Sequence, residues 1–198
     1  MNNKIKILAF VACASAATTM AIGGIETIPS IPTRAGVTPG AYSCASVHFG
    51  MDDGSLKGDA NLGSADSVSV GDHTGSIGVV SGITMTSHTV SNQAVYAHTS
   101  AGLKMSSAKK NSTLALTFNA SVCACTIYAV GWKGDDVSLS VNGGDSQSIA
   151  SSDAITGTST VSDVTYEPYF FEFDASNTIT IAATKRLVIG DISLRVAL

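Results

Sequence analysis

Apolar and polar residues alternate along several short segments of this chain, and this spacing restricts what the chain can fold into. Residues 113–119 (TLALTFN) place their three large apolar side chains on one side, and residues 136–141 (DVSLSV), 177–181 and 191–198 repeat the pattern. A period of two is typical of half-buried strands. No segment after residue 40 sustains helical spacing over ten residues. The sequence therefore predicts an all-β fold.

Weaker strand patterns bring the expected number of strands close to a dozen. Proline at the start of a strand is permitted, so the aromatic run after Pro168 is included. Turn signals such as Gly131, Asn142-Gly143-Gly144 and Gly190 separate these runs. Short strands at such intervals predict an antiparallel two-sheet β-sandwich of jelly-roll type over residues 41–198. The additional strand candidates are residues 42–49, 67–70, 76–80, 83–90, 94–98, 103–105, 121–130 and 169–174.

The first 40 residues have the composition of an export signal followed by a linker. Lys4 and Lys6 precede an uncharged run from Ile7 to Ile25, which predicts a secretory signal peptide over about residues 1–23 and an extracellular or cell-surface location. This run is weakly apolar for a stable membrane span, which needs about 20 strongly apolar residues. Residues 24–40 contain three prolines and read as a linker. Small residues allow cleavage after Ala14, Ala16 or Gly23.

Cysteine usage leaves several alternatives open. Cys13 lies in the predicted signal peptide, in a segment similar to a bacterial lipobox, where it could be lipidated. Cys44, Cys123 and Cys125 remain in the mature chain, so at least one thiol is left over. Cys44 could pair with Cys123 or Cys125, while burial in a strand is the simpler reading of the Cys-Ala-Cys motif, because zinc sites usually need four ligands.

Charge argues against a nucleic-acid binder. Only 13% of the residues are charged and the formal net charge is −4, with no basic cluster along the sequence. A nucleic-acid-binding chain normally shows a basic patch or stripe. We therefore expect no nucleic-acid partner.

No catalytic motif is present. Serines are abundant and four histidines occur, but no motif singles out a Ser-His pair. Glu167 and Glu172 could form a carboxylate pair, yet Glu172 alternates outward beside Asp174 as on an ordinary solvated strand. We predict no enzymatic activity, no catalytic residue and no cofactor.

An acidic, Gly- and Ser-rich stretch is the one candidate for a metal. Calcium takes about six to eight oxygen ligands from flexible loops. The same residue types are those that turns require, so an ordinary solvated loop explains them equally well. A structural calcium ion is therefore an open alternative, and no metal ligand is assigned. The residues concerned are Asp52, Asp53, Asp59, Asn61, Asp66 and Asp72.

Aromatic side chains are the candidates for ligand binding. Sugar rings stack on aromatic faces, and Trp132 is the single tryptophan, in an expected turn. Tyr166 and Tyr96 are the further candidates, whereas Tyr169 shares the apolar alternation with Phe171 and is expected in the core. Packing at the edge of the fold is the alternative role for Trp132.

From Ile83 to Leu198 the chain resembles a β-sandwich module of secreted and surface proteins of Firmicutes and related bacteria, sometimes found beside extracellular nucleases or hydrolases. The resemblance implies an accessory, non-catalytic jelly roll, similar in form to carbohydrate-binding modules. The segments that carry it are residues 101–107 (AGLKMSS), 114–118 (LALTF), 127–132 (IYAVGW), 138–143 (SLSVNG), 166–171 (YEPYFF) and 185–192 (KRLVIGDI).

The sequence thus predicts a secreted binding module for polysaccharide or other cell-surface material. The alternative is a structural or adhesive subunit of a bacterial surface assembly. Few lysines guard the Ser/Thr-rich strands against edge-to-edge pairing, which is compatible with self-association.

Overall fold

The computed structural model describes residues 42–49, 71–74, 77–91, 95–98, 102–155 and 164–198, which form strands and no helix. The predicted signal peptide, the linker and the strand candidate 67–70 lie outside the described residues. Among the described residues, no helix has the length and apolar character to cross a membrane. The strands are β1 (Tyr42–His48), β2 (Gly71–Thr74), β3 (Val79–Ser81), β4 (Met85–Ser91), β5 (Val95–His98), β6 (Gly102–Met105), β7 (Ser112–Gly131), β8 (Val137–Val141), β9 (Gln147–Ile149), β10 (Glu167–Ala183) and β11 (Leu187–Ala197).

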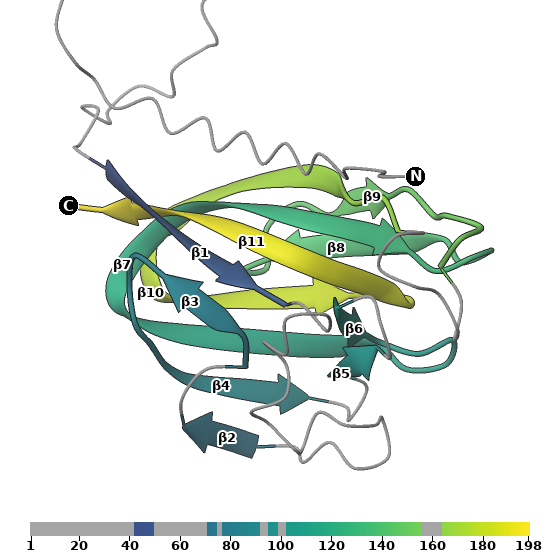
Figure 1. The fold of residues 1–198 in the computed structure, drawn as a ribbon, viewed down its shortest axis with the longest axis horizontal. Coiled ribbons are helices and arrows are strands. Elements are labelled where there is room, and N and C mark those ends of the chain that lie inside the picture. The colour runs from purple at the N-terminus through teal and green to yellow at the C-terminus, as the bar shows by residue number, and fades with distance from the viewer. Residues whose placement is uncertain (1–41, 50–70, 75–76, 92–94, 99–101, 156–163) are drawn as a thin grey trace, which may run out of the picture.

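The predicted all-β, antiparallel fold is confirmed for this part of the chain. Every pairing between these strands is antiparallel. The eleven strands are linked in one sheet with the main order β3-β1-β11-β7-β10-β8-β9, while β4 joins β7 and β6 joins β11 (Figure 1). The pairing alone does not divide the strands into two sheets.

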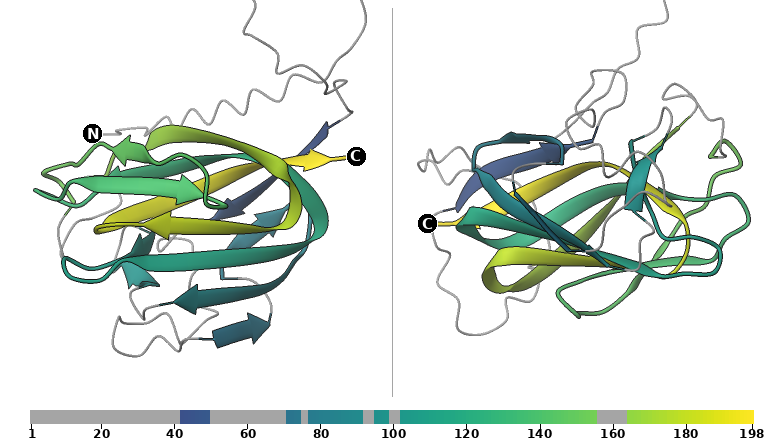
Figure 2. Two further views of the ribbon diagram at one scale, coloured as in Figure 1. Left: turned by 180° about the vertical axis from the view of Figure 1, so that it is seen from behind. Right: turned by 90° about the horizontal axis from the view of Figure 1, so that it is seen from below.

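Two long strands carry the sheet from one layer of the fold into the other (Figure 2). In the first layer, β3, β1 and β11 lie beside residues 122–131 of β7 and 167–176 of β10. In the second layer, β4 and β8 flank residues 112–118 of β7 and 178–183 of β10. The sheet therefore folds over on itself and encloses its own apolar face.

The sequence prediction of separate strands in these regions was wrong. Residues 113–119 and 121–130 belong to the single strand β7, and residues 169–174 and 177–181 belong to β10. Polar residues such as Asn119 and Asn177 resemble turn signals, but the strands continue through them with shifted register. Bulges of this kind bend a strand without ending it, which explains why the sequence pattern suggests a break.

One apolar core lies between the two layers. Leu114 and Ile181 from the second layer belong to the same cluster as Ile127 and Ile192 from the first. Phe118 from β7 is 2% exposed. Burial of such side chains is the main stabilising contribution to a fold of this kind. Tyr169 packs against this core, as predicted from its alternation with Phe171.

The turn after β8 has the backbone geometry expected of a tight hairpin turn. Asn142 and Gly143 both have positive φ values, 52° and 70°. Asn and Gly tolerate this region better than other residues. The Asn142 backbone N–H donates to the Thr180 carbonyl at 2.8 Å, and its side-chain oxygen accepts from the Thr180 N–H at 2.7 Å. The turn is thereby fastened to β10.

Candidate functional site

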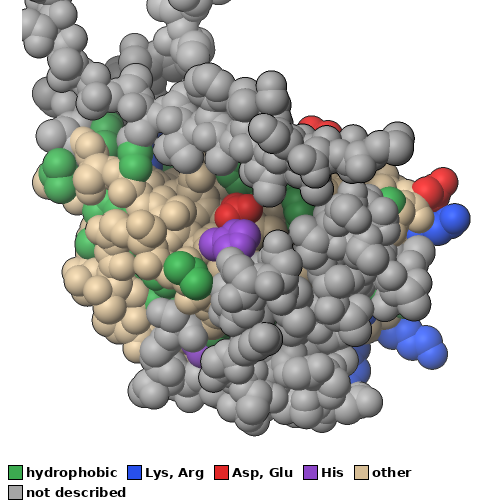
Figure 3. Space-filling view, in the orientation of Figure 1, with side chains coloured by type: hydrophobic (Ala, Val, Ile, Leu, Met, Phe, Trp, Pro, Cys, Tyr) green, Lys and Arg blue, Asp and Glu red, His purple; other side chains and the backbone are tan. Residues whose placement is uncertain are grey.

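The outer surface of the first layer collects polar and aromatic side chains from four strands. Alternate residues of β1 and β11 point away from the core, and the strand register aligns them in rows. In the view of Figure 3, charged side chains cover only a small part of the described surface. Three successive rows contain His48, Asp191 and Tyr128, then Ser46, Ser193 and Thr126, then Cys44, Arg195 and Ala124.

Arg195 lies between two exposed aromatic rings on this surface. Its guanidinium carbon is 5.3 Å from the centre of the Tyr42 ring and 5.9 Å from that of Phe170. Its Nη1 atom is 3.7 Å from Oε1 of Glu172. Tyr42 is 38% and Phe170 46% exposed. We call Tyr42, Phe170, Glu172 and Arg195 the Arg195 face.

A small residue makes the ion pair of this face possible. Ala124 of β7 lies opposite Arg195 of β11 on one side and opposite Glu172 of β10 on the other. Because alanine has only a methyl group, the two charged side chains can meet above it. Ala124 is 1% exposed. The ion pair and rings thus form a continuous surface across β1, β11, β7 and β10.

A histidine–aspartate pair lies further along the same surface. His48 and Asp191 face each other in register, and Nδ1 of His48 is 2.7 Å from Oδ1 of Asp191. Both side chains are half exposed, at 41% and 46%. A carboxylate on Nδ1 orients a histidine as a base, and catalysis then needs a nucleophile near the other ring nitrogen. Its row neighbours are Val79 and Tyr128, neither of which supplies a serine or cysteine nucleophile.

The carboxylate pair considered from the sequence does not converge. Glu167 and Glu172 lie five positions apart on β10, in a stretch paired residue by residue with β7. Side chains five apart on a regular strand point to opposite faces. Both residues are exposed, and Glu172 faces outward as predicted. These two carboxylates therefore lack the geometry of a glycosidase pair.

Trp132 and Tyr166 lie together in a second, smaller apolar cluster, which we call the Trp132 cluster together with the charged residues around it. Both are half-buried and pack against Val130, Val188 and Ile155. The Tyr166 ring covers Gly190, where an added Cβ would approach ring atoms to between 3.0 and 3.2 Å. Their partial burial favours a packing role. Tyr96, the third predicted ligand-binding residue, lies in β5, and its side chain is outside the described residues.

Two cations lie over the Trp132 ring, and a carboxylate pairs with one of them. The Lys104 Nζ is 4.4 Å and the Arg186 guanidinium carbon 5.0 Å from the ring centre. Arg186 donates two hydrogen bonds to Asp135, at 2.7 and 3.2 Å. Burial lowers the pKa of Lys104 from 10.5 to about 8, helped by Arg186 and opposed by Asp135. The hydrogen bond from Arg186 lowers the pKa of Asp135.

The cysteine pairing considered from the sequence is wrong. Cys123 and Cys125 are free thiols, so neither is bonded to Cys44. Strand β11 lies between Cys44 on β1 and the two cysteines on β7, with Arg195 in the row between them. Cys44 is therefore two strand spacings, about 10 Å, from Cys123 and Cys125. A disulfide needs Cα atoms within about 7 Å. Burial raises the pKa of Cys123, and that of Cys125 to about 12, so neither thiol is a reactive thiolate at neutral pH.

The acidic stretch considered for calcium cannot be placed. Five of its six residues lie outside the described residues, and Asp72 is described only by its backbone in β2. In the described part of the chain, no group of three or more His, Cys, Asp or Glu side chains could hold a metal ion.

Comparison with known proteins adds no assignment. No family model, curated protein or solved structure matches the chain. The case for a function therefore depends on the geometry of the chain itself.

The residues of the Arg195 face were not among the predicted ligand-binding residues. Arg195 could be assigned to the outward side of residues 191–198, and Phe170 alternates with Phe171 in the run after Pro168. The sequence carries no signal that β1 and β10 lie on opposite sides of β11 and β7. That neighbourhood comes from strand order alone.

Proposed function

We propose that this protein is a secreted, non-catalytic module that binds polysaccharide or other cell-surface material through the Arg195 face. The observation that carries the proposal is the pair of exposed rings, Tyr42 and Phe170, on either side of the Arg195–Glu172 ion pair. Aromatic faces pack on the apolar side of sugar rings, while guanidinium and carboxylate groups form hydrogen bonds with hydroxyls.

The dimensions of the face suit a polymer. The strands that carry Tyr42 and Phe170 are three strand spacings apart, but both rings lean toward Arg195, which brings their centres within about 11 Å of each other. Neighbouring sugars of one polymer chain can therefore contact both aromatic residues. A surface of this kind needs no deep pocket.

The rest of the proposal depends on the sequence. The N-terminal segment with a signal-peptide composition supports secretion, and the resemblance of residues 83–198 to accessory modules supports a binding role. We further propose that the folded-over sheet corresponds to a sandwich of the jelly-roll type. An accessory module of this type has no chemistry of its own.

A pull-down on insoluble polysaccharides, with a glycan array, tests this proposal. We expect the full chain to be retained on a defined glycan, and Phe170→Ala and Tyr42→Ala to weaken retention. Trp132→Phe and Tyr166→Phe are the matched aromatic controls, because these rings belong to the second cluster. Loss of binding in the controls alone would move the site to Trp132. Repeating the experiment with a chelator tests the structural calcium.

A structural or adhesive subunit is the second candidate. Among the described strands, β3 pairs only with β1, and Val79 on it is 55% exposed. An unpaired edge with an exposed apolar residue can add a strand from another molecule. Concentration-dependent assembly in sedimentation velocity, with no retention on any glycan, would favour this candidate. A monomer at high concentration would count against it.

A further inference from the structure

The fold brings together basic residues that lie far apart in the sequence. Three turns meet at one end of the molecule: residues 106–111, 132–136 and 184–186. The part of the chain that the structure describes contains seven Lys and Arg residues, and all except Arg195 belong to this end. Figure 3 shows most of the basic side chains gathered at one side of the molecule. These six residues are Lys104, Lys109, Lys110, Lys133, Lys185 and Arg186.

Four of these six residues are exposed, and three of the four are not paired with a carboxylate of the described residues. Lys104 is buried, Arg186 is paired with Asp135, and Lys133 lies 3.7 Å from Asp153. Lys109, Lys110 and Lys185 are exposed. They form a basic rim on a protein whose net charge is negative, −4.

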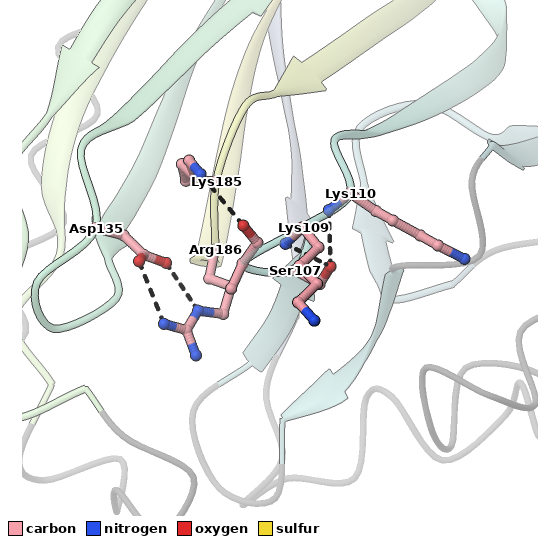
Figure 4. A network of polar contacts seen from close by, with 7 residues as sticks. Ser107, Lys109, Lys110, Asp135, Lys185 and Arg186 are labelled. Atoms are coloured by element: carbon pink, nitrogen blue, oxygen red, sulfur yellow. Dashed lines mark hydrogen bonds and ion pairs between the residues drawn. The ribbon is translucent and has the colours of Figure 1, made fainter.

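Hydrogen bonds fix the backbone of the turn that carries Lys109 and Lys110, and one of them holds the amino group of Lys185 against this turn. The backbone N–H groups of Lys109 and Lys110 donate to Oγ of Ser107 at 3.3 and 2.9 Å, which forms a tight turn. Nζ of Lys185 donates to the Ala108 carbonyl of the same turn at 3.2 Å. Figure 4 shows the three lysines around this turn, with the Arg186–Asp135 pair beside it.

Next to the rim is a small hollow on the outer surface of the second layer, with a volume of about 120 Å³. Lys110 precedes Asn111 of its lining and Lys185 follows Thr184. Ala182 lies between Thr113 and Ser140 in register, so its small side chain creates the depression. None of the described residues that line the hollow is charged. Its lining is Asn111, Ser112, Thr113, Ser138, Ser140, Ser146, Ala182, Ala183 and Thr184.

The hydroxyl groups of the hollow are held by an ordered network. Oγ of Ser138 and Oγ1 of Thr184 are 2.9 Å apart. Beneath them, the buried Ser106 and Ser112 share a hydrogen bond of 2.9 Å, and Oγ of Ser106 donates to the Ala183 carbonyl at 2.8 Å. Hydroxyl groups fixed in this way can donate to and accept from the hydroxyls of a bound sugar.

We propose that this hollow is a subsite for an acidic sugar residue of a polysaccharide. The hydroxyl lining receives the ring, and Lys109, Lys110 and Lys185 attract its carboxylate or phosphate group. The inference rests on the proposed function in taking the ligand to be a glycan, but it uses a surface separate from the Arg195 face. The ligand is therefore an anionic polysaccharide.

Binding of the full chain to immobilised polygalacturonate tests the inference, with fully methyl-esterified polygalacturonate as the neutral control on the same backbone. A phosphomannan, in which the phosphate is carried on a sugar ring, forms the phosphate arm, and duplex DNA distinguishes sugar recognition from simple charge attraction. We expect retention on at least one of the acidic glycans, weaker retention on the methyl ester and weaker retention on DNA.

Two sets of variants locate the site. The triple change Lys109→Gln, Lys110→Gln and Lys185→Gln should weaken binding about tenfold, since each exposed ion pair contributes little alone. Ala182→Leu fills the hollow and should have a similar effect. Lys133→Gln at the same end and Ala115→Leu on the same outer surface are the matched controls, and both should bind within about twofold of the wild type.

The outcomes separate this inference from the proposed function. Absence of retention on both acidic polymers, equal retention on DNA, or unchanged binding by Ala182→Leu would overturn the subsite. Binding lost in Phe170→Ala but kept in the lysine and Ala182 variants would leave the Arg195 face as the only site. Binding lost in the lysine and Ala182 variants but kept in Phe170→Ala would support the subsite and contradict the Arg195 face.

Discussion

Two regions of this molecule combine an arginine, a carboxylate and an aromatic ring, yet they differ in burial. In the Trp132 cluster, Arg186 donates two hydrogen bonds to Asp135 and lies over the indole. On the Arg195 face, the arginine reaches Glu172 at 3.7 Å and lies near two rings. The same residue types can therefore serve stability in one place and remain available to a ligand in another.

The two regions differ in how far their ion pairs are exposed to solvent. Arg186 and Asp135 have side chains 27% and 14% exposed, whereas those of Arg195 and Glu172 are 41% and 68% exposed. The residues around Trp132 include Val130, Val188 and Ile155, which exclude water from that end of the first layer. An ion pair removed from water depends on its partner, while an exposed pair contributes little.

Neutralising the carboxylate of each ion pair is the most direct test of this difference. We expect Asp135→Asn to lower the free energy of unfolding by about 2–3 kcal/mol, because Arg186 and Lys104 then lie over Trp132 without a counter-charge. The matched change Glu172→Gln should cost less than about 0.5 kcal/mol. Urea unfolding followed by Trp132 fluorescence measures both. Equal effects of the two changes would contradict the distinction.

The pH dependence of stability should show that folding lowers the pKa of Lys104. Its pKa is lowered from 10.5 to about 8 on folding, so between these values the unfolded chain binds a proton that the folded chain does not. Stability should therefore rise as the pH increases from about 8 to 10.5, by roughly 2 kcal/mol. The reference is the urea unfolding of Lys104→Met over the same pH range. Subtracting it from the wild type removes the contribution of groups that titrate in the same way in both proteins. A wild-type minus variant difference that stays constant across this range would contradict the prediction.

The contrast between the two regions could be predicted only in part from the sequence. Period-two alternation in residues 113–119 and 191–198 predicts which side chains face the core, because that depends on local geometry. Tyr169 in the core and Glu172 on the surface follow from the same rule. Local patterns of this kind are sufficient for the fold class.

Which residues of different strands lie side by side could not be predicted in this way. Tyr42 and Phe170 are far apart in sequence and meet Arg195 only because β11 and β7 lie between β1 and β10. The three lysines of the basic rim also come from two separate turns, joined by the contact of Lys185 with Ala108. No residue spacing along the chain encodes such long-range pairings.

A substitution at Gly190 tests whether the Tyr166 ring packs over this glycine at the edge of the Trp132 cluster. An added Cβ at this position would approach the Tyr166 ring to 3.0–3.2 Å, so Gly190→Ala must displace the ring. We expect a loss of about 1 kcal/mol in urea unfolding. In a Tyr166→Ala background, which has lost the ring, the same change should cost much less. An equal cost in both backgrounds would show that Tyr166 does not cover the glycine in solution.

Arg195 should show the smallest effect on stability and one of the largest on binding. Removing an exposed arginine that is 3.7 Å from its carboxylate should change the free energy of unfolding by less than about 0.5 kcal/mol in Arg195→Met. The same variant removes the charged group between Tyr42 and Phe170, so retention on the glycan bound by the wild type should fall. Arg186→Met is the control: it should lose stability while its folded fraction still binds. If Arg195→Met instead unfolds as readily as Arg186→Met, the Arg195 face is part of the structural framework and not a free surface.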